Sequence, residues 1–134
     1  MATGTAGTQA RSYGTHQVHY LRKAFSFADT TAVAITVGIL PAGALILRNL
    51  SGVQINVAFT AATNHRLDIG TPANDDLYAT DLELNAIDFI EIDEAVSMVV
   101  DVDTTITATP DLTGASNTAG SGEVVIAYLI RDGV

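Results

Sequence analysis

This sequence has no cysteine and no tryptophan, and it is poor in charged side chains, which make up 16% of its 134 residues. The absence of cysteine excludes disulfides, cysteine-bound zinc and thiol nucleophiles. Positive charge is scarcest: six Lys and Arg residues stand against fifteen Asp and Glu residues, which gives a net charge of −9. A chain with this charge repels phosphate backbones, so direct nucleic-acid binding is not expected.

The sequence also lacks a long apolar run. No segment approaches the ~20 apolar residues that a membrane-spanning helix needs, and no basic start followed by an apolar stretch marks a secretory signal. It has no polybasic segment that anionic lipids would attract. We therefore expect a soluble protein that is made in the cytoplasm and does not bind membranes. Apolar residues make up 48% of the chain; they either fill a β core or are partly covered by partners and further copies.

Residues 1–16 (MATGTAGTQARSYGTH) contain almost no large side chains and show no periodicity. Such a segment buries too little surface to offset its ordering entropy, which predicts a flexible N-terminal arm. Arg11, Tyr13 and His16 are its only side chains suited to gripping another surface, so the arm either orders on a partner or stays disordered. Residues 17–134 are predicted to form one β-sandwich domain, because this length suits a single core.

The clearest periodic pattern lies in residues 52–59. Val53, Ile55, Val57 and Phe59 alternate with polar or small residues, and this period of two predicts a half-buried strand. The segment carries no recognisable chemistry, so it is predicted to be part of a β scaffold.

Seven further segments have the alternation or the apolar composition of strands. They are residues 17–28, 31–39, 44–49, 66–70, 86–92, 97–106 and 123–131. The mixed faces of the first predict an edge position or a bulge. The last is apolar on both sides, which predicts a central strand or a subunit contact. In the second, Val33, Ile35, Val37 and Ile39 are expected to face inward.

Two segments lack a strand pattern. Residues 81–84, before Asn85, favour a loop or a helical turn, and residues 107–122, which are rich in turn formers, are predicted to be a long loop. About eight strands with short turns and no long helix indicate an all-β protein. The expected fold is a jelly-roll-like antiparallel β-sandwich, with an immunoglobulin-like sandwich of seven strands as the alternative.

Acidic residues crowd the second half of the chain and offer oxygen ligands for calcium. Candidates are Asp75 and Asp76 with nearby Asp81, and the pair Asp101 and Asp103. The alternating pattern of a calcium-binding loop, with its glycine and distant glutamate, is absent, and aspartates in turns usually bond to their own backbone. We therefore predict no metal site, and leave a calcium site at Asp75 and Asp76 open.

No catalytic constellation can be assembled from the motifs. The G-x-S-x-G turn of a nucleophilic serine and the glycine-rich loop that cradles phosphate are both absent. His16 and His19 are three residues apart, but on a strand their side chains diverge, and His65 lies alone in a loop. We predict that the chain is not an enzyme and has no catalytic residue and no cofactor, with a small hydrolase on a β scaffold as a rival.

The segments LPAGALIL and VQINVAFTAATNHRLDIGTPANDD, between Leu40 and Asp76, resemble small structural proteins of tailed phages. Those proteins combine a strand, an Ala-Gly turn and an L-x-I-G-T strand end that is followed by an acidic loop. More specifically, the chain resembles the head decoration or cementing proteins of short-tailed phages of the Bordetella phage group. The likeness covers residues 17–134 in overall pattern.

This resemblance implies a jelly-roll-like domain in the virion, on the outer surface of the capsid, with the major capsid protein as its partner. It also implies a homo-oligomer, often a dimer that bridges neighbouring capsomers, and no catalysis. It carries over no individual binding residue. A carbohydrate-binding β module of a phage tail or of a secreted protein is the alternative function, and it would need aromatic residues gathered at one rim.

The side chains expected to contact a partner are mostly basic, with a few that serve as anchors. They are Arg11, Tyr13, His16, Arg22, Lys23, Arg48 and Leu112. The basic side chains would meet an acidic shell surface, whereas Tyr13 and the predicted loop around Leu112 would act as apolar anchors.

Overall fold

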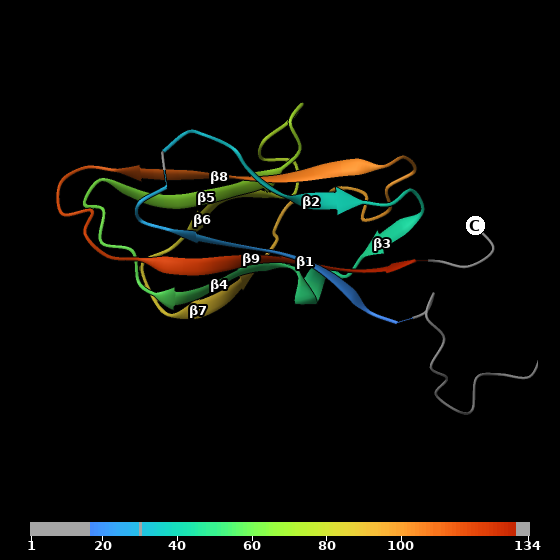
Figure 1. Cartoon of the computed structure of the whole chain (residues 1–134), viewed down its shortest axis with the longest axis horizontal. Helices are drawn as coiled ribbons and strands as arrows, with labels where there is room; N and C mark the ends of the chain where they lie inside the picture. Colours follow the sequence, from blue (N-terminus) through green and yellow to red (C-terminus); the bar gives the residue numbers. More distant parts are fainter. Residues whose placement is uncertain (1–16, 30, 131–134) are drawn as a thin grey trace, which may run out of the picture.

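The computed structural model describes residues 17–29 and 31–130 and arranges them in two antiparallel sheets that pack face to face (Figure 1). Sheet A contains β1 (His19–Ser26), β9 (Ser121–Ile130), β4 (Gly52–Val57) and β7 (Asp88–Glu91) in this order, and β3 (Ala44–Ile46) also pairs with β9. Sheet B contains β2 (Ile35–Leu40), β8 (Thr104–Thr113), β5 (Asn64–Gly70) and β6 (Ala79–Glu83). Within these ranges, no helix has the length and apolar character needed to cross a membrane.

The strands pair from the outside of the chain inward. If β3 is set aside, the first strand pairs with the last (β1 with β9), the second with the last but one (β2 with β8), and so on to β4 with β7 and β5 with β6. A long hairpin rolled into two four-stranded sheets gives this order, which is that of a jelly roll. The predicted jelly-roll-like sandwich is therefore confirmed, and the seven-stranded immunoglobulin-like alternative is not the fold.

The core lies between the two sheets and is built from aliphatic side chains of both. Fully buried examples are Leu40, Val53, Ile55, Leu67, Ile69, Leu84, Ile106 and Ile126. Each such side chain contributes about 1.5–3 kcal/mol relative to an exposed one. Phe25 of β1 stacks on Phe59 with ring centroids 5.3 Å apart, which closes one part of the core.

The predicted alternation in residues 52–59 is confirmed for three of its four apolar positions. Val53, Ile55 and Phe59 are buried, but Val57 is 47% exposed. The β4–β9 pairing shifts register between Ile55 and Val57. A one-residue shift moves the next side chain to the other face of the sheet, so the prediction for Val57 is wrong.

The predicted inward row of residues 31–39 is wrong at both ends. Val33 and Ile39 are 54% and 60% exposed. The pairing of β2 with β8 shifts between Thr36 and Gly38, which turns Ile39 outward and places Leu40 in the core instead. The bulge, rather than the apolar pattern, decides which side chain is buried.

The predicted long loop at residues 107–122 is also wrong, because β8 continues to Thr113. The prediction rested on the many turn formers of this segment, and one of them, Pro110, lies within the strand, where proline is unusual. Its carbonyl oxygen accepts a hydrogen bond from the Ala32 N–H at 2.7 Å, beyond the last β2–β8 pair at Ala108. The proline nitrogen therefore faces a side where the ladder has ended, and its missing N–H costs no strand hydrogen bond.

The remaining differences concern strand limits. Residues 97–103 are irregular apart from one bridge, Val99 to Leu45, so the strand predicted at 97–106 begins only at Thr104. The strand predicted at 44–49 ends at Ile46, and residues 81–83 belong to a strand rather than to a loop. The edge position of β1 and the central position of β9 are confirmed.

Candidate interaction surfaces

The outer face of sheet B is polar and bears several ion pairs. The side chains of β8 that point away from the core are threonines and an aspartate: Thr105, Thr107, Thr109, Asp111 and Thr113. On the neighbouring strands, Arg66 Nε lies 3.0 Å from Glu83 Oε1, and Arg66 Nη1 lies 3.6 Å from Asp81 Oδ2. This face is polar and offers few apolar contacts to a partner, but it is not evenly solvated: Thr107 is 4% exposed, and the Thr107 and Thr109 hydroxyls are buried without a hydrogen-bond partner among the described residues.

Acidic side chains gather at one part of this face, around Asp68. Burial raises the pKa of the Asp68 carboxyl, and the negative charges of Asp81, Asp75 and Asp76 raise it further. The Asp81 N–H donates to Asp68 Oδ1 at 2.7 Å, which acts in the opposite direction. Among the residues that the structure describes, no three His, Asp or Glu side chains converge as metal ligands.

The outer face of sheet A is mainly apolar. Since Val124 and Ile126 of β9 point into the core, the alternate residues of β9 and their neighbours on β1 and β3 point outward. We call the side chains Tyr20, Leu45, Leu50, Val125 and Leu129 the apolar face. Tyr20 and Leu50 are its most exposed members, at 51% and 47%.

A short 3₁₀ turn, Arg48–Leu50, carries Leu50 on this face. β3 and β4 pair with the same side of β9, but five residues separate Ile46 from Gly52 whereas only two separate their partners Tyr128 and Val125. The extra residues leave the plane of the sheet, and Figure 1 shows the turn projecting from sheet A on the side away from sheet B. The turn therefore forms a protrusion on the otherwise regular outer surface of sheet A.

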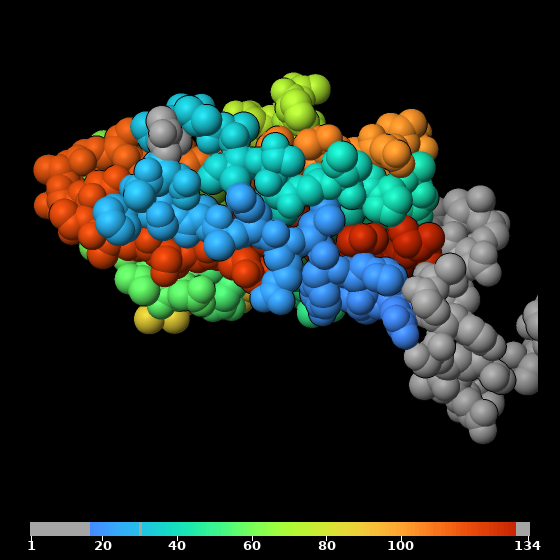
Figure 2. Space-filling view, viewed as in Figure 1, coloured from blue at the N-terminus to red at the C-terminus, as the bar shows by residue number. Residues whose placement is uncertain are grey.

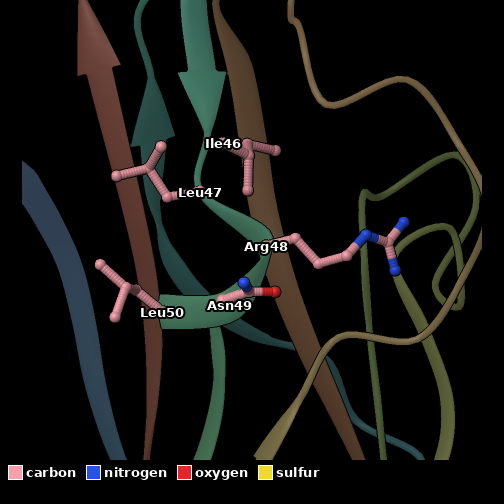
Figure 3. Close-up of a pocket in the computed structure, with 5 residues that line it drawn as sticks. All are labelled: Ile46, Leu47, Arg48, Asn49 and Leu50. Carbon is pink, nitrogen blue, oxygen red and sulfur yellow. The ribbon is translucent and has the colours of Figure 1, made fainter.

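The turn is anchored at both ends by hydrogen bonds. The buried Ser51 hydroxyl donates to the Leu47 carbonyl at 2.8 Å and accepts from the Ala127 N–H at 2.9 Å. Arg48 points the other way and donates to the carbonyl of Ile92 at 3.1 Å and to that of Glu94. Residues 46–50 line an open depression of about 430 Å³, in which Leu47 and Leu50 point to the side opposite Arg48 (Figure 3).

The structure places the predicted partner contacts in different settings. Arg11, Tyr13 and His16 lie outside the described residues. Arg22 and Lys23 are exposed on the edge strand β1, where Arg22 Nε lies 2.8 Å from Glu123 Oε1. Arg22 shares the outer side of β1 with Tyr20, so it borders the apolar face.

Besides Arg22, which pairs with Glu123, two of the predicted contacts are engaged within the chain. The guanidinium of Arg48 is held by the two carbonyls of the segment after β7. Leu112 lies in β8 rather than in a loop, and it is 5% exposed in the core, so it does not form the exposed apolar anchor that was expected.

The described tyrosines do not gather at one rim, which is what a carbohydrate-binding surface would need. Tyr20 is on the apolar face, whereas Tyr78 is buried at 3% exposure, and this burial raises the pKa of its hydroxyl. Tyr128 lies on the inner side of β9, with its ring 5.6 Å from that of His19.

Sequence reasoning did not single out the apolar face. Tyr20 was visible only as part of a mixed strand, and Leu50 as a turn residue. The useful signal was the second row of the strand at 123–131, because Val125 and Leu129 have no polar alternation. That row of side chains predicted a central strand or a subunit contact. Which side chains lie beside it on the sheet is known only from the pairing of β9 with β1 and β3.

Comparison with known proteins supports the fold. No protein-family model and no curated protein sequence matches this chain. Among solved structures, a chain in the structure titled "Cyanophage Pam1 capsid asymmetric unit" is similar, with a TM-score of 0.62 and 23% sequence identity. The similarity covers 98% of each chain, and it shows that the two proteins share a fold.

Proposed function

We propose that this chain is a structural protein of a tailed-phage virion that decorates and cements the outside of the capsid. The observation that carries the proposal is the whole-length structural similarity to a chain of a phage capsid. The sequence resemblance to cementing proteins of the Bordetella phage group points in the same direction. In this function the chain is made in the host cytoplasm, has no catalytic activity and binds the major capsid protein.

The apolar face is the surface best suited to the shell. It combines exposed Tyr20 and Leu50 with the flatter Leu45, Val125 and Leu129, and aromatic side chains at the centre of a desolvated patch contribute most to binding. Arg22 lies at its border, where it is ion-paired with Glu123, and in this proposal its guanidinium also contacts an acidic shell. The polar and acidic face of sheet B then points to solvent.

In this proposal the chain stabilises the shell by burying surface area against shell subunits where they meet. A standard interface buries about 1,600 Å², which is modest for one copy. Many symmetric copies that also associate with one another, as a dimer or a larger unit, hold the shell together because linked weak contacts add to high avidity. The shell then resists the internal pressure of packaged DNA.

Addition of the purified protein to phage heads that have been stripped of it tests this function. We expect cryo-EM density for the protein on the outer surface at capsomer joints, and release of DNA at a higher temperature than from bare heads. Absence of bound protein would overturn the proposal.

Variants can show which face binds. Replacement of Tyr20 and Leu50 by serine is expected to weaken binding to heads at least about tenfold. Val102→Ser is the matched control, because Val102 is 63% exposed but lies outside the apolar face. Equal binding by all variants would exclude the apolar face as the docking surface.

A further inference from the structure

In the described part of the chain, β1, β7, β2 and β6 end the two sheets, and β1 is the longest and most regular of these four strands. The pairings of β2 and β6 with their neighbours both shift register, and β7 has only four residues. β1 pairs with β9 over all eight residues without a shift, and no other strand of residues 17–29 and 31–130 pairs with it. It lies on the front of the molecule in Figure 2. A long, regular edge is a template for another strand.

The main-chain groups that β1 offers can be identified from the hydrogen-bond alternation. The Phe27 N–H donates to the Gly120 carbonyl at 3.0 Å, in register with the β1–β9 ladder. Since bonded pairs alternate along antiparallel strands, the odd-numbered residues of β1 face β9. The N–H and C=O groups of Tyr20, Arg22 and Ala24 therefore face the free edge.

The opposite edge of the same sheet is β7, and the same argument applies there. The Ile92 N–H donates to the Ser51 carbonyl at 2.9 Å, so the pair Val53 and Ile90 is bonded and the main-chain groups of Phe89 point away from β4. The Phe89 N–H is met at 2.8 Å by the carboxylate of the adjacent Asp88. This exposed donor is therefore satisfied by a local carboxylate instead of a strand.

We propose that copies of this chain associate head to tail, with β1 of one copy paired antiparallel to β7 of the next. The two edges carry opposite charges: Lys23 lies on β1, and Asp88 and Glu91 lie on β7. The second cation of β1, Arg22, is ion-paired with Glu123 within the chain. Their directions also fit, because three successive antiparallel pairs make β1 antiparallel to β7 within one copy. Copies in the same orientation therefore pair antiparallel.

One register satisfies both the hydrogen bonds and the side chains. With Arg22 opposite Phe89, the Phe89 N–H donates to the Arg22 carbonyl, and the Asp88 carboxylate is released to pair with Lys23, which is then directly opposite. Leu21 meets Ile90 in the same row. Paired residues share a face, and both rows agree with the inward and outward sides of sheet A.

Pairing of β1 with β1 of a second copy fits less well. It brings Arg22 and Lys23 of the two copies close together, and like charges on neighbouring strands are destabilising. A register that places Arg22 opposite Glu91 sets Phe25 against Asp88 and leaves Lys23 opposite Ile90. Only the first register gives every charged side chain of the inner row an opposite charge.

Head-to-tail contacts generate closed rings, or filaments where the rotation does not close. Because the outer side of β1 continues into the outer side of β7, the apolar faces of successive copies form one surface. This inference rests on the self-association within the proposed function, and not on binding to a shell.

The test is charge reversal, with the mass in solution measured by native mass spectrometry and sedimentation. The wild-type protein is expected to form multiples of the 14.0-kDa chain. Lys23→Glu and Asp88→Lys should each weaken association at least tenfold, and the double variant Lys23→Glu/Asp88→Lys should restore it. Asp101→Lys changes the charge equally at an exposed residue of a loop and should have no effect.

Several outcomes would overturn the proposal: a wild-type protein that is monomeric at millimolar concentration, single variants that still associate, or a double variant that does not recover. Insensitivity to Asp88→Lys alone would indicate β1–β1 pairing. Circular dichroism checks each fold, and Lys23→Gln and Asp88→Asn replace a variant that does not fold. The self-association experiment contains no phage heads. A failure to self-associate can therefore be distinguished from a failure to bind heads.

Discussion

The Ser51 hydroxyl lies 2.9 Å from the Ala127 main-chain nitrogen and accepts its hydrogen bond at the point where β3 gives way to β4. The same hydroxyl donates to the Leu47 carbonyl at 2.8 Å. One buried side chain therefore replaces the strand hydrogen bonds that the 3₁₀ turn interrupts, and it fixes the turn that presents Leu50.

Ser51→Ala is expected to lower the free energy of unfolding by about 1–3 kcal/mol, because it leaves the buried Ala127 N–H without an acceptor. Chemical denaturation measures the change. Ser97→Ala is the control, since Ser97 is exposed and bonds only locally to Val99. If both substitutions had the same small effect, the hydroxyl would not be holding the turn.

Gly52→Ala should be among the most damaging substitutions in the chain. A Cβ at Gly52 would lie 1.9 Å from the Ile90 carbonyl oxygen, which belongs to the adjacent strand. Either β7 moves or the sheet separates, and we expect a loss of roughly 3 kcal/mol or more in thermal or denaturant unfolding.

Gly43→Ala is the matched control for this prediction. Gly43 has a φ of +85° but has no atom within 4 Å of an added Cβ. Its replacement should cost only the backbone strain, about 1 kcal/mol. A smaller loss for Gly52→Ala than for Gly43→Ala would show that the steric account of the β4–β7 contact is wrong.

Asp68→Asn should stabilise the protein at neutral pH. Burial, and then the charges around it, raise the pKa of the Asp68 carboxyl above its ordinary value of 3.8. The folded state therefore holds a proton more tightly than the unfolded state, and stability falls as the pH rises from 3.8 through the raised pKa. The asparagine oxygen can still accept from the Asp81 N–H.

The gain from Asp68→Asn should be small, at most about 0.5 kcal/mol, because the side chain is partly solvated. It should be fully present at pH 7 and vanish below pH 3.8, where the carboxyl is protonated in both states. Asp101→Asn, at an exposed site, is the control for the loss of one negative charge. A gain that grows on acidification would contradict the sign of the argument.

Calcium removal should leave the melting temperature unchanged. Asp75 and Asp76 lie near Asp68, but no ligand group of three or more His, Asp or Glu residues forms in the part of the chain that the structure describes. Differential scanning calorimetry with and without a chelator measures the effect. A fall of several degrees on chelation would reveal a calcium site in the acidic loop.

The fold class was predictable because most strands have a local apolar pattern. Val53 and Ile55 alternate with polar residues, and the strand at the end of the described chain is apolar on both sides: Val124 and Ile126 face the core, and Val125 and Leu129 belong to the apolar face. Such a pattern can be read from residues that are adjacent in sequence, because successive side chains of a strand alternate between the buried and the exposed face.

The errors arose where tertiary structure overrides the local pattern. The exposure of Ile39 follows from a bulge that one extra residue creates, and a bulge has no apolar period of its own. Pro110 is tolerated only because β2 ends before it reaches the proline. Neither fact can be derived from residues adjacent in sequence.

The interaction surfaces were predictable only in part. The charges of Lys23 and Asp88 are evident in the sequence, but their places on opposite edges of one sheet depend on the order of four strands. Leu112 illustrates the opposite case. A leucine in a segment rich in turn formers was expected at the surface, and the continuation of β8 buries it.

The pairing of the first strand with the last has a kinetic consequence. Arg22 binds Glu123, 101 positions further along the chain, so β1 has no sheet partner until β9 has left the ribosome. Topologies dominated by such distant contacts fold slowly. The edge that we propose for self-association is therefore expected to form only after β9 has been synthesised, so shorter nascent chains lack it.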